Sequence, residues 1–75
     1  MTPVINPLPY RKVHRALLRL GFRVDRQVGG HVVHVHPDGR LMSVPRHDRE
    51  EISPGFMRRL LKDAKIDADD FVDAL

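Results

Sequence analysis

The stretch that decides the fold runs from Val28 to Arg40 and reads VGGHVVHVHPDGR. Two turn signals enclose a run of alternating residues. Gly29-Gly30 matches a two-residue hairpin turn in which both positions favour positive φ, and Asp38-Gly39 matches a second turn of the same length. The stretch therefore predicts a central strand that tight turns join to one strand on either side.

These two turns fix the strand register. Because cross-strand partners share a face of the sheet, pairing through these turns places His31, Val33 and Val35 on one apolar face. We expect that face to pack against the rest of the protein, with His34 and His36 on the opposite, solvated face. The expected pairs are Val28 with His31, Arg26 with Val33, Val24 with Val35, Val35 with Met42, Val33 with Val44, His34 with Asp25, and His36 with Arg23.

Helical patterns flank the predicted sheet. Before it, apolar residues recur at the spacing of an amphipathic helix that begins soon after Pro9 and stops at Gly21. After it, Ser53 followed by Pro54 is typical of a helix start, and Asp67 is expected to cap a short final helix. The apolar positions of the three helices are Val13, Ala16, Leu17 and Leu20; Phe56, Met57, Leu60, Leu61 and Ala64; and Phe71, Val72 and Leu75.

The order of elements predicts the fold class. Pro45 cannot donate to a strand ladder, so the third strand is expected to end there and to be an edge. We predict an α+β fold of helix, three-stranded antiparallel meander, helix and short helix, with the two longer helices covering one face. Double-stranded-RNA-binding domains share this arrangement. Residues 1–9 are expected to form an extended lead-in and residues 10–75 a single domain.

Composition narrows the class of function. The 75 residues include no cysteine, which excludes disulfides and thiolate metal sites, and the chain is too short for a deep cofactor cleft. Without a membrane-length apolar run or a signal peptide, we expect a cytoplasmic protein with no membrane contact and no cofactor. Residues 1–49 carry nine Lys or Arg against three Asp, whereas residues 50–75 carry four against seven acidic residues. This asymmetry favours a polyanion, with nucleic acid as the first candidate.

The histidines are candidates for chemistry or for simple structural roles. Alternate strand positions place His34 and His36 on one side with Asp25, where they could bind a metal, but two imidazoles at this spacing are weak support and we expect no metal site. His47 is expected in a solvated loop. His14 is expected on the exposed face of the first helix, with no role.

His31 stands apart because the predicted register puts it at the hairpin tip, on the margin of the apolar face. An imidazole there contacts both core and solvent, a setting that moves a histidine pKa. Gly29 and Gly30 carry no side chains, so a phosphate backbone could approach closely. The alternative is that His31 only fills the rim of the core and that both glycines serve only the turn.

Taken together, these segments resemble the HicA toxins, the small ribonuclease partners of type II toxin–antitoxin modules. The matching stretches are ALLRLGFRVDRQVGGHVVHVHPDGR, SVPRH and SPGFMRRLLKDAKIDADDFVDAL, which cover nearly all of residues 13–75. The resemblance implies a double-stranded-RNA-binding-like fold, ribonuclease activity on mRNA and inhibition by a HicB antitoxin. It assigns the family's essential histidine to His31. Gly30 stands where serine is commonest in the family, and Lys65 where a glycine often ends the helix, which predicts a less sharp break before the last helix.

The resulting hypothesis is a metal-independent endoribonuclease that cleaves mRNA. His31 acts in it as general base on the ribose 2'-hydroxyl or as general acid toward the leaving oxygen. No second catalytic histidine is assigned. A HicB-type antitoxin is expected to cover the His31 region. The alternatives are an RNA-binding module without catalysis and an interaction protein whose basic surface binds an acidic partner. The residues expected to contact RNA are Lys12, Arg15, Arg26, Gly29, Gly30, Arg40 and Arg46.

Overall fold

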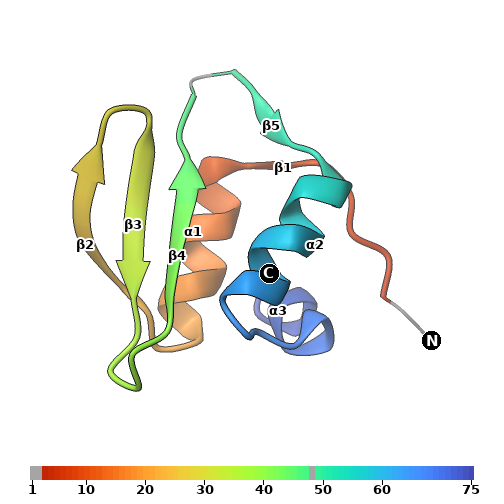
Figure 1. Ribbon diagram of the computed structural model, residues 1–75. Coiled ribbons are helices and arrows are strands. Elements are labelled where there is room, and N and C mark those ends of the chain that lie inside the picture. Colours follow the sequence, from red (N-terminus) through yellow and green to blue (C-terminus); the bar gives the residue numbers. More distant parts are fainter. Residues whose placement is uncertain (1–2, 48) are drawn as a thin grey trace.

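The predicted α+β order is confirmed by a computed structural model that describes residues 3–47 and 49–75 (Figure 1). A three-stranded antiparallel sheet of order β2-β3-β4 lies in front of the first helix. The other two helices lie beside that helix, on the side away from β2. In the part of the chain that is described, no helix is long and apolar enough to cross a membrane. The main elements are α1 (Tyr10–Arg19), β2 (Arg23–Val28), β3 (His31–Val35), β4 (Leu41–Pro45), α2 (Pro54–Asp63) and α3 (Ala68–Asp73).

The predicted helix ends are confirmed. Helix α1 begins directly after Pro9, and Gly21 follows its end with a φ of +94°. The hydroxyl of Ser53 accepts from the Phe56 N–H at 3.4 Å, and the Asp67 carboxylate caps α3. These caps satisfy backbone N–H groups that have no partner within the helix. Strand β4 ends at Pro45 and is an edge strand, as predicted.

The turn between β3 and β4 is longer than predicted. The His36 N–H donates to the Arg40 carbonyl at 2.8 Å, and the Gly39 N–H donates to the His36 carbonyl at 2.9 Å. Gly39 has a φ of +96°, so Pro37-Asp38-Gly39 forms a three-residue loop with glycine in the left-handed position. The longer loop shifts β4 by one residue. The predicted pairs Val35–Met42 and Val33–Val44 are wrong; the observed pairs are Val35–Leu41, His34–Met42, Val33–Ser43, Val32–Val44 and His31–Pro45.

A β-bulge changes the other half of the register. The pairs Val28–His31 and Arg26–Val33 are confirmed, but the register shifts between Val24 and Arg26, where Asp25 is the extra residue. Beyond this point β2 is displaced by one position relative to the prediction. The predicted pairs Val24–Val35, His34–Asp25 and His36–Arg23 are wrong; the observed pairs are Val24–His34 and Arg23–Val35.

The register inverts the predicted faces of β3. Val32 and His34 share a face with Met42 and Val44, which lie in the core beneath the helices. His31 therefore lies on the opposite, helix-free face, because successive strand residues alternate. The prediction that His34 decorates a solvated face is wrong, since its exposed fraction is 0%.

The N-terminal segment contributes more than the predicted lead-in. Strand β1 (Leu8–Pro9) pairs antiparallel with β5 (Glu51–Ile52), and the side chains of Ile5, Leu8 and Ile52 are buried in the core. Strands of two residues are too short to produce a period in the sequence, which is why this small sheet was not predicted. Among the predicted apolar helix positions, Phe56 and Leu75 stay 40% and 42% exposed.

The one buried polar side chain among those described is His34, which joins the sheet to α1. Its Nδ1 lies 3.3 Å from the Val32 carbonyl, which only accepts, so Nδ1 carries the proton. The bare Nε2 then accepts from Nδ1 of His14 at 2.9 Å. The ring of His14 stacks on Tyr10, so the prediction that His14 lies on the exposed helix face is wrong. Burial is the main cause that lowers the pKa of His34, which keeps the imidazole neutral.

We predict that stability falls in mildly acidic solution because of His34. The unfolded imidazole titrates near its ordinary pKa of about 6.5, whereas the folded pKa is lower, so the unfolded chain binds more protons below that pH. The stabilising free energy that the neutral His34 contributes is complete above about pH 6.5 and is lost as the pH falls toward the folded pKa. The free energy of unfolding in urea, measured at a series of pH values below and above about 6.5, tests this. The His34→Met variant has no titrating group here and should show a flatter curve; an equally steep curve would contradict the assignment.

The break between α2 and α3 is sharp, contrary to the expectation from Lys65. The residue itself adopts a left-handed φ of +57°, and the Ile66 N–H donates to the Leu61 carbonyl at 2.9 Å. This is the helix-ending geometry that glycine usually provides. Lys65 therefore holds a conformation that costs a side-chain-bearing residue roughly 1–2 kcal/mol.

We predict that Lys65→Gly stabilises the protein. Relief of the left-handed conformation outweighs the greater freedom of glycine in the unfolded chain, so we expect a gain of about 0.5–1 kcal/mol in the free energy of unfolding. Lys65→Ala is the matched control, because it removes the same charge and keeps the strain. A Lys65→Gly variant no more stable than Lys65→Ala in denaturant titrations would contradict this.

Candidate functional site

The hairpin between β2 and β3 forms an open tip at one end of the sheet (Figure 1). His31 is the first residue of β3 and is exposed there. It lies on the helix-free face together with Val28, its cross-strand partner. The predicted position of His31 at the tip is confirmed. Its ring lies on the face opposite the core, however, and not at the edge of the apolar face as predicted.

His47, which the sequence left in a solvated loop, lies next to this tip. The ring centroids of His31 and His47 are 6.5 Å apart, and the rings meet at 81°, edge to face. The backbone holds this arrangement, because the Arg46 N–H donates to the Gly30 carbonyl at 2.7 Å and so continues the pairing of β3 with β4 by one residue. The structure therefore brings together two imidazoles that are 16 positions apart in the chain.

The two glycines at the tip have different roles. Gly29 has a φ of +57° and provides the left-handed turn residue, with open space where a Cβ would be. Gly30 is not in the positive-φ region, so the prediction that both positions need it is wrong. A Cβ on Gly30 would lie 2.9 Å from Cε1 of His47. Gly30 thus gives the His47 ring room over the backbone.

Arg46 comes directly before His47 in the chain and directs its guanidinium toward helix α1. Its guanidinium carbon lies 5.0 Å from the ring centroid of Tyr10, a cation–π contact, while the other end of the residue is held by Gly30. Partial burial raises the pKa of Tyr10, and the positive charge of Arg46 opposes that rise. The ring of Tyr10 also stacks on His14, so a line of aromatic contacts connects buried His34 to Arg46.

Arg26 is the second cation on the His31 side of the sheet. Its partner Val33 and the pair Val28–His31 alternate onto the same face. The Arg26 guanidinium pairs with Asp25, and its side chain is 62% exposed. The register prediction that placed Arg26 near His31 is therefore consistent with the observed strand pairing.

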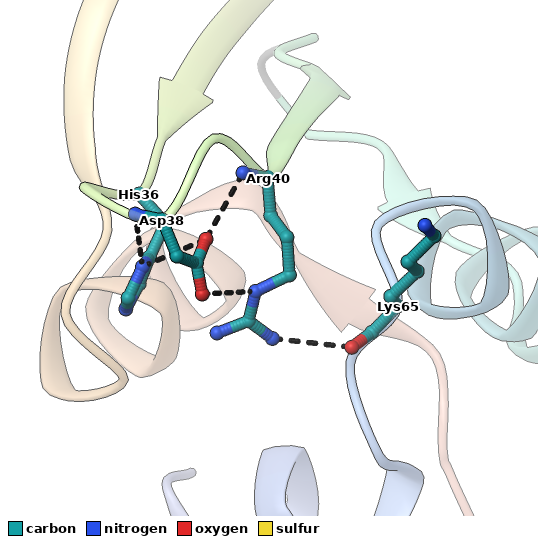
Figure 2. A network of polar contacts seen from close by, with 4 residues as sticks. All are labelled: His36, Asp38, Arg40 and Lys65. Atoms are coloured by element: carbon teal, nitrogen blue, oxygen red, sulfur yellow. Dashed lines mark hydrogen bonds and ion pairs between the residues drawn. The ribbon is translucent and has the colours of Figure 1, made fainter.

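Arg40 lies at the other end of the sheet, where it braces the β3–β4 loop (Figure 2). Its guanidinium donates to the Asp38 carboxylate at 2.8 Å and to the Lys65 carbonyl at 3.1 Å. The Arg40 backbone N–H also donates to Asp38, and this hydrogen bond is the main cause that lowers the pKa of that carboxyl. The structure does not bring Arg40 together with His31.

Lys12 and Arg15 lie on the exposed side of α1. They line a hollow of about 280 Å³ together with Arg19 and Leu75. Arg11, Arg15 and Arg19 are four residues apart along α1, so their side chains form a basic row on one face of the helix. This basic row belongs to the helical layer, and its first member, Arg11, lines a hollow together with His47.

The residues considered as a metal site, His34, His36 and Asp25, do not form one. His34 lies in the core, whereas His36 lies beside the β3–β4 loop, where the ring centroids of His36 and Phe22 are 5.0 Å apart. No group of three potential ligands among His, Cys, Asp and Glu occurs within residues 3–47 and 49–75.

A shallow hollow of about 610 Å³ opens beside the tip. It is lined by Gln27 from β2 and by Arg46, His47 and Glu50 from the loop after β4. A smaller hollow shares Arg46, His47 and Glu50 with it and is also lined by Arg11 and Arg49. Sequence reasoning missed these neighbours because local spacing does not indicate which loop returns to the tip. Open imidazoles and cations without a deep cleft suit a charged polymer backbone better than an enclosed small molecule.

Comparison with known protein families identifies the family of this chain. A family model described as "HicA toxin of bacterial toxin-antitoxin" matches residues 10–66, a span that includes the tip, the loop after β4 and helix α2. No curated protein matches the chain with significance. Because the family match covers most of the sequence, the chain belongs to the HicA family of toxins from bacterial toxin–antitoxin systems.

Proposed function

We propose that this protein is a metal-independent endoribonuclease that cleaves mRNA, with His31 as general acid or base. The observation that carries the proposal is an exposed imidazole at an open tip with arginines nearby. Membership of the HicA toxin family supports an RNA target. An unenclosed site is sufficient because RNA carries its own nucleophile, the ribose 2'-hydroxyl.

The reaction proposed is an internal transesterification. The 2'-oxygen attacks the adjacent phosphorus as its proton leaves, the bond from phosphorus to the 5'-oxygen breaks, and that oxygen gains a proton. The products are a 2',3'-cyclic phosphate and a free 5'-hydroxyl. His31 exchanges a proton with one of the two oxygens, a role typically worth roughly 10²- to 10⁴-fold in rate. Arg26 and Arg46 would stabilise charge on the phosphate oxygens as the transition state forms.

The RNA-binding surface proposed is the hairpin tip and its surroundings. Gly29 and Gly30 leave the backbone open to a phosphate, and Arg26 and Arg46 supply positive charge there. Lys12 and Arg15, on α1, would extend contacts along a longer strand. Arg40 was expected to contact RNA, but its hydrogen bonds to Asp38 and Lys65 support a bracing role instead.

We expect His31→Ala to lose cleavage by roughly 10²- to 10⁴-fold while still binding RNA. The assay follows a labelled RNA in chelator, and the products should carry 2',3'-cyclic phosphate ends. Arg59→Ala, an exposed change on α2, is the control and should cleave normally. Equal cleavage by both variants would place the activity elsewhere. Binding without cleavage by the unmodified protein would favour an RNA-binding module, and binding to an acidic protein without RNA affinity would favour the interaction protein.

A HicB-type antitoxin is proposed to inhibit by covering the tip. Blocking substrate access is the simplest inhibition for a site that is open on the surface. In the complex, backbone amides of residues 26–34 should therefore exchange with deuterium more slowly than in the free toxin. The peptide of residues 54–63 in α2 serves as the internal reference. Protection confined to the helices, with an unchanged tip, would contradict steric inhibition.

A further inference from the structure

We infer that His47 is the second acid–base residue of the cleavage reaction and that it acts with His31 on one phosphodiester. The inference rests on the proposed ribonuclease function and adds a residue that the sequence analysis placed in a solvated loop. One imidazole removes the proton from the attacking 2'-hydroxyl. The other donates a proton to the departing 5'-oxygen. The two rings end the reaction with their protonation states exchanged, so the proton balance closes within the pair.

The first support is that hydrogen bonds between β3 and the end of β4 hold the chain directly before His47 at the tip. Strand β4 pairs with β3 as far as Pro45 opposite His31, and the Arg46 N–H then donates to the Gly30 carbonyl at 2.7 Å. The guanidinium of Arg46 lies over Tyr10 on the helical side. His47 follows the end of β4 and lines a hollow together with Gln27 of β2, which places it beside the tip.

The second support is Gly30. The turn requires positive φ at Gly29 and not at Gly30, so turn geometry does not explain a glycine at the second position. In this structure the absent side chain has a second effect, because a Cβ on Gly30 would lie 2.9 Å from Cε1 of the His47 ring. The missing side chain therefore lets the His47 ring lie over the backbone beside His31.

The third support is the distance between the two rings. In an in-line displacement the attacking and leaving oxygens lie on opposite sides of phosphorus, so two separate groups are needed. Rings in direct hydrogen-bond contact would leave no room for a phosphate. Centroids 6.5 Å apart, edge to face, place two separate imidazoles side by side at the tip, where both can reach a phosphate that docks over them. A proton-transferring group must come within about 2.6–3.2 Å of its oxygen, which small rotations of two exposed side chains allow.

The surroundings of His47 fit a role at a phosphate. Arg46 supplies positive charge at the adjacent position, and Gln27 of β2 lines the same hollow with amide donors. Among the described residues, Glu50 also lines the hollow, and Glu50 and Glu51 line a further hollow together with His47. The ring remains exposed, so substrate reaches it without any rearrangement of the core.

The first experiment compares His47→Ala with His31→Ala and with Arg59→Ala in single-turnover cleavage of a short RNA. We expect each histidine variant to lose roughly 10²- to 10⁴-fold in rate, while affinity for the same RNA with a 2'-deoxy cleavage site changes little. Loss of activity in His31→Ala with full activity in His47→Ala would overturn the inference and leave the proposed function intact. Normal activity in His31→Ala would overturn the proposed function itself. Parallel losses of rate and affinity in His47→Ala would show a binding residue.

A substrate with sulfur in place of the 5'-bridging oxygen separates the two roles. The thiolate leaves without protonation, so this substrate should restore the rate of whichever variant lacks the general acid and should not restore the other. Rescue of one histidine variant and not the other is the expected result. Rescue of neither, or equal rescue of both, would overturn the assignment of an acid–base pair.

Gly30→Ala tests the positioning role of Gly30 independently. The added Cβ should displace the His47 ring and slow cleavage, with folding monitored by urea unfolding. Combined with His47→Ala, the same change should cost little more, because the ring that it displaces is already gone. A full additional loss in the double variant would show that Gly30 acts other than through His47.

Discussion

The hydrogen bond from the His36 N–H to the Arg40 carbonyl closes the loop on which the arrangement of this protein depends. It makes the connection between β3 and β4 three residues long. Met42 and Val44 are buried against the helices, so the loop length determines which residues of β3 share their face. With three residues the partners are Val32 and His34, and His31 is left on the open side. One more or one fewer residue in this turn would exchange the buried and exposed histidines.

The sequence predicts much of the fold because the helix signals are local. Apolar spacing in α1, the Ser53 and Asp67 caps and the proline at the end of β4 each act within a few residues. The register was harder to predict because valine occupies both Val32 and Val33, so either face of β3 could be called apolar. Turn residues of the Asp-Gly type also fit both two- and three-residue loops. The bulge at Asp25 has no comparable sequence signal.

The candidate site was predicted in part for the same reason. The position of His31 at the tip follows from the first turn, which is local and was assigned correctly. The position of His47 follows from the end of β4 and its bond to Gly30, which depend on pairing between distant segments. His34 shows the opposite case, in which a polar residue is accepted in the core because His14 and the Val32 carbonyl satisfy both ring nitrogens. Strand alternation alone identifies neither partner.

The bulge in β2 also affects how this small protein behaves at high concentration. In the part of the chain that the structure describes, β2 pairs only with β3, so its outer edge is open to strand addition by another copy. The extra residue Asp25 interrupts the regular spacing of the N–H and C=O groups along that edge, and its neighbours Arg23 and Arg26 are charged and exposed. An incoming strand would meet a twisted edge and like charges, so the distortion that moved the register also protects the toxin from aggregation.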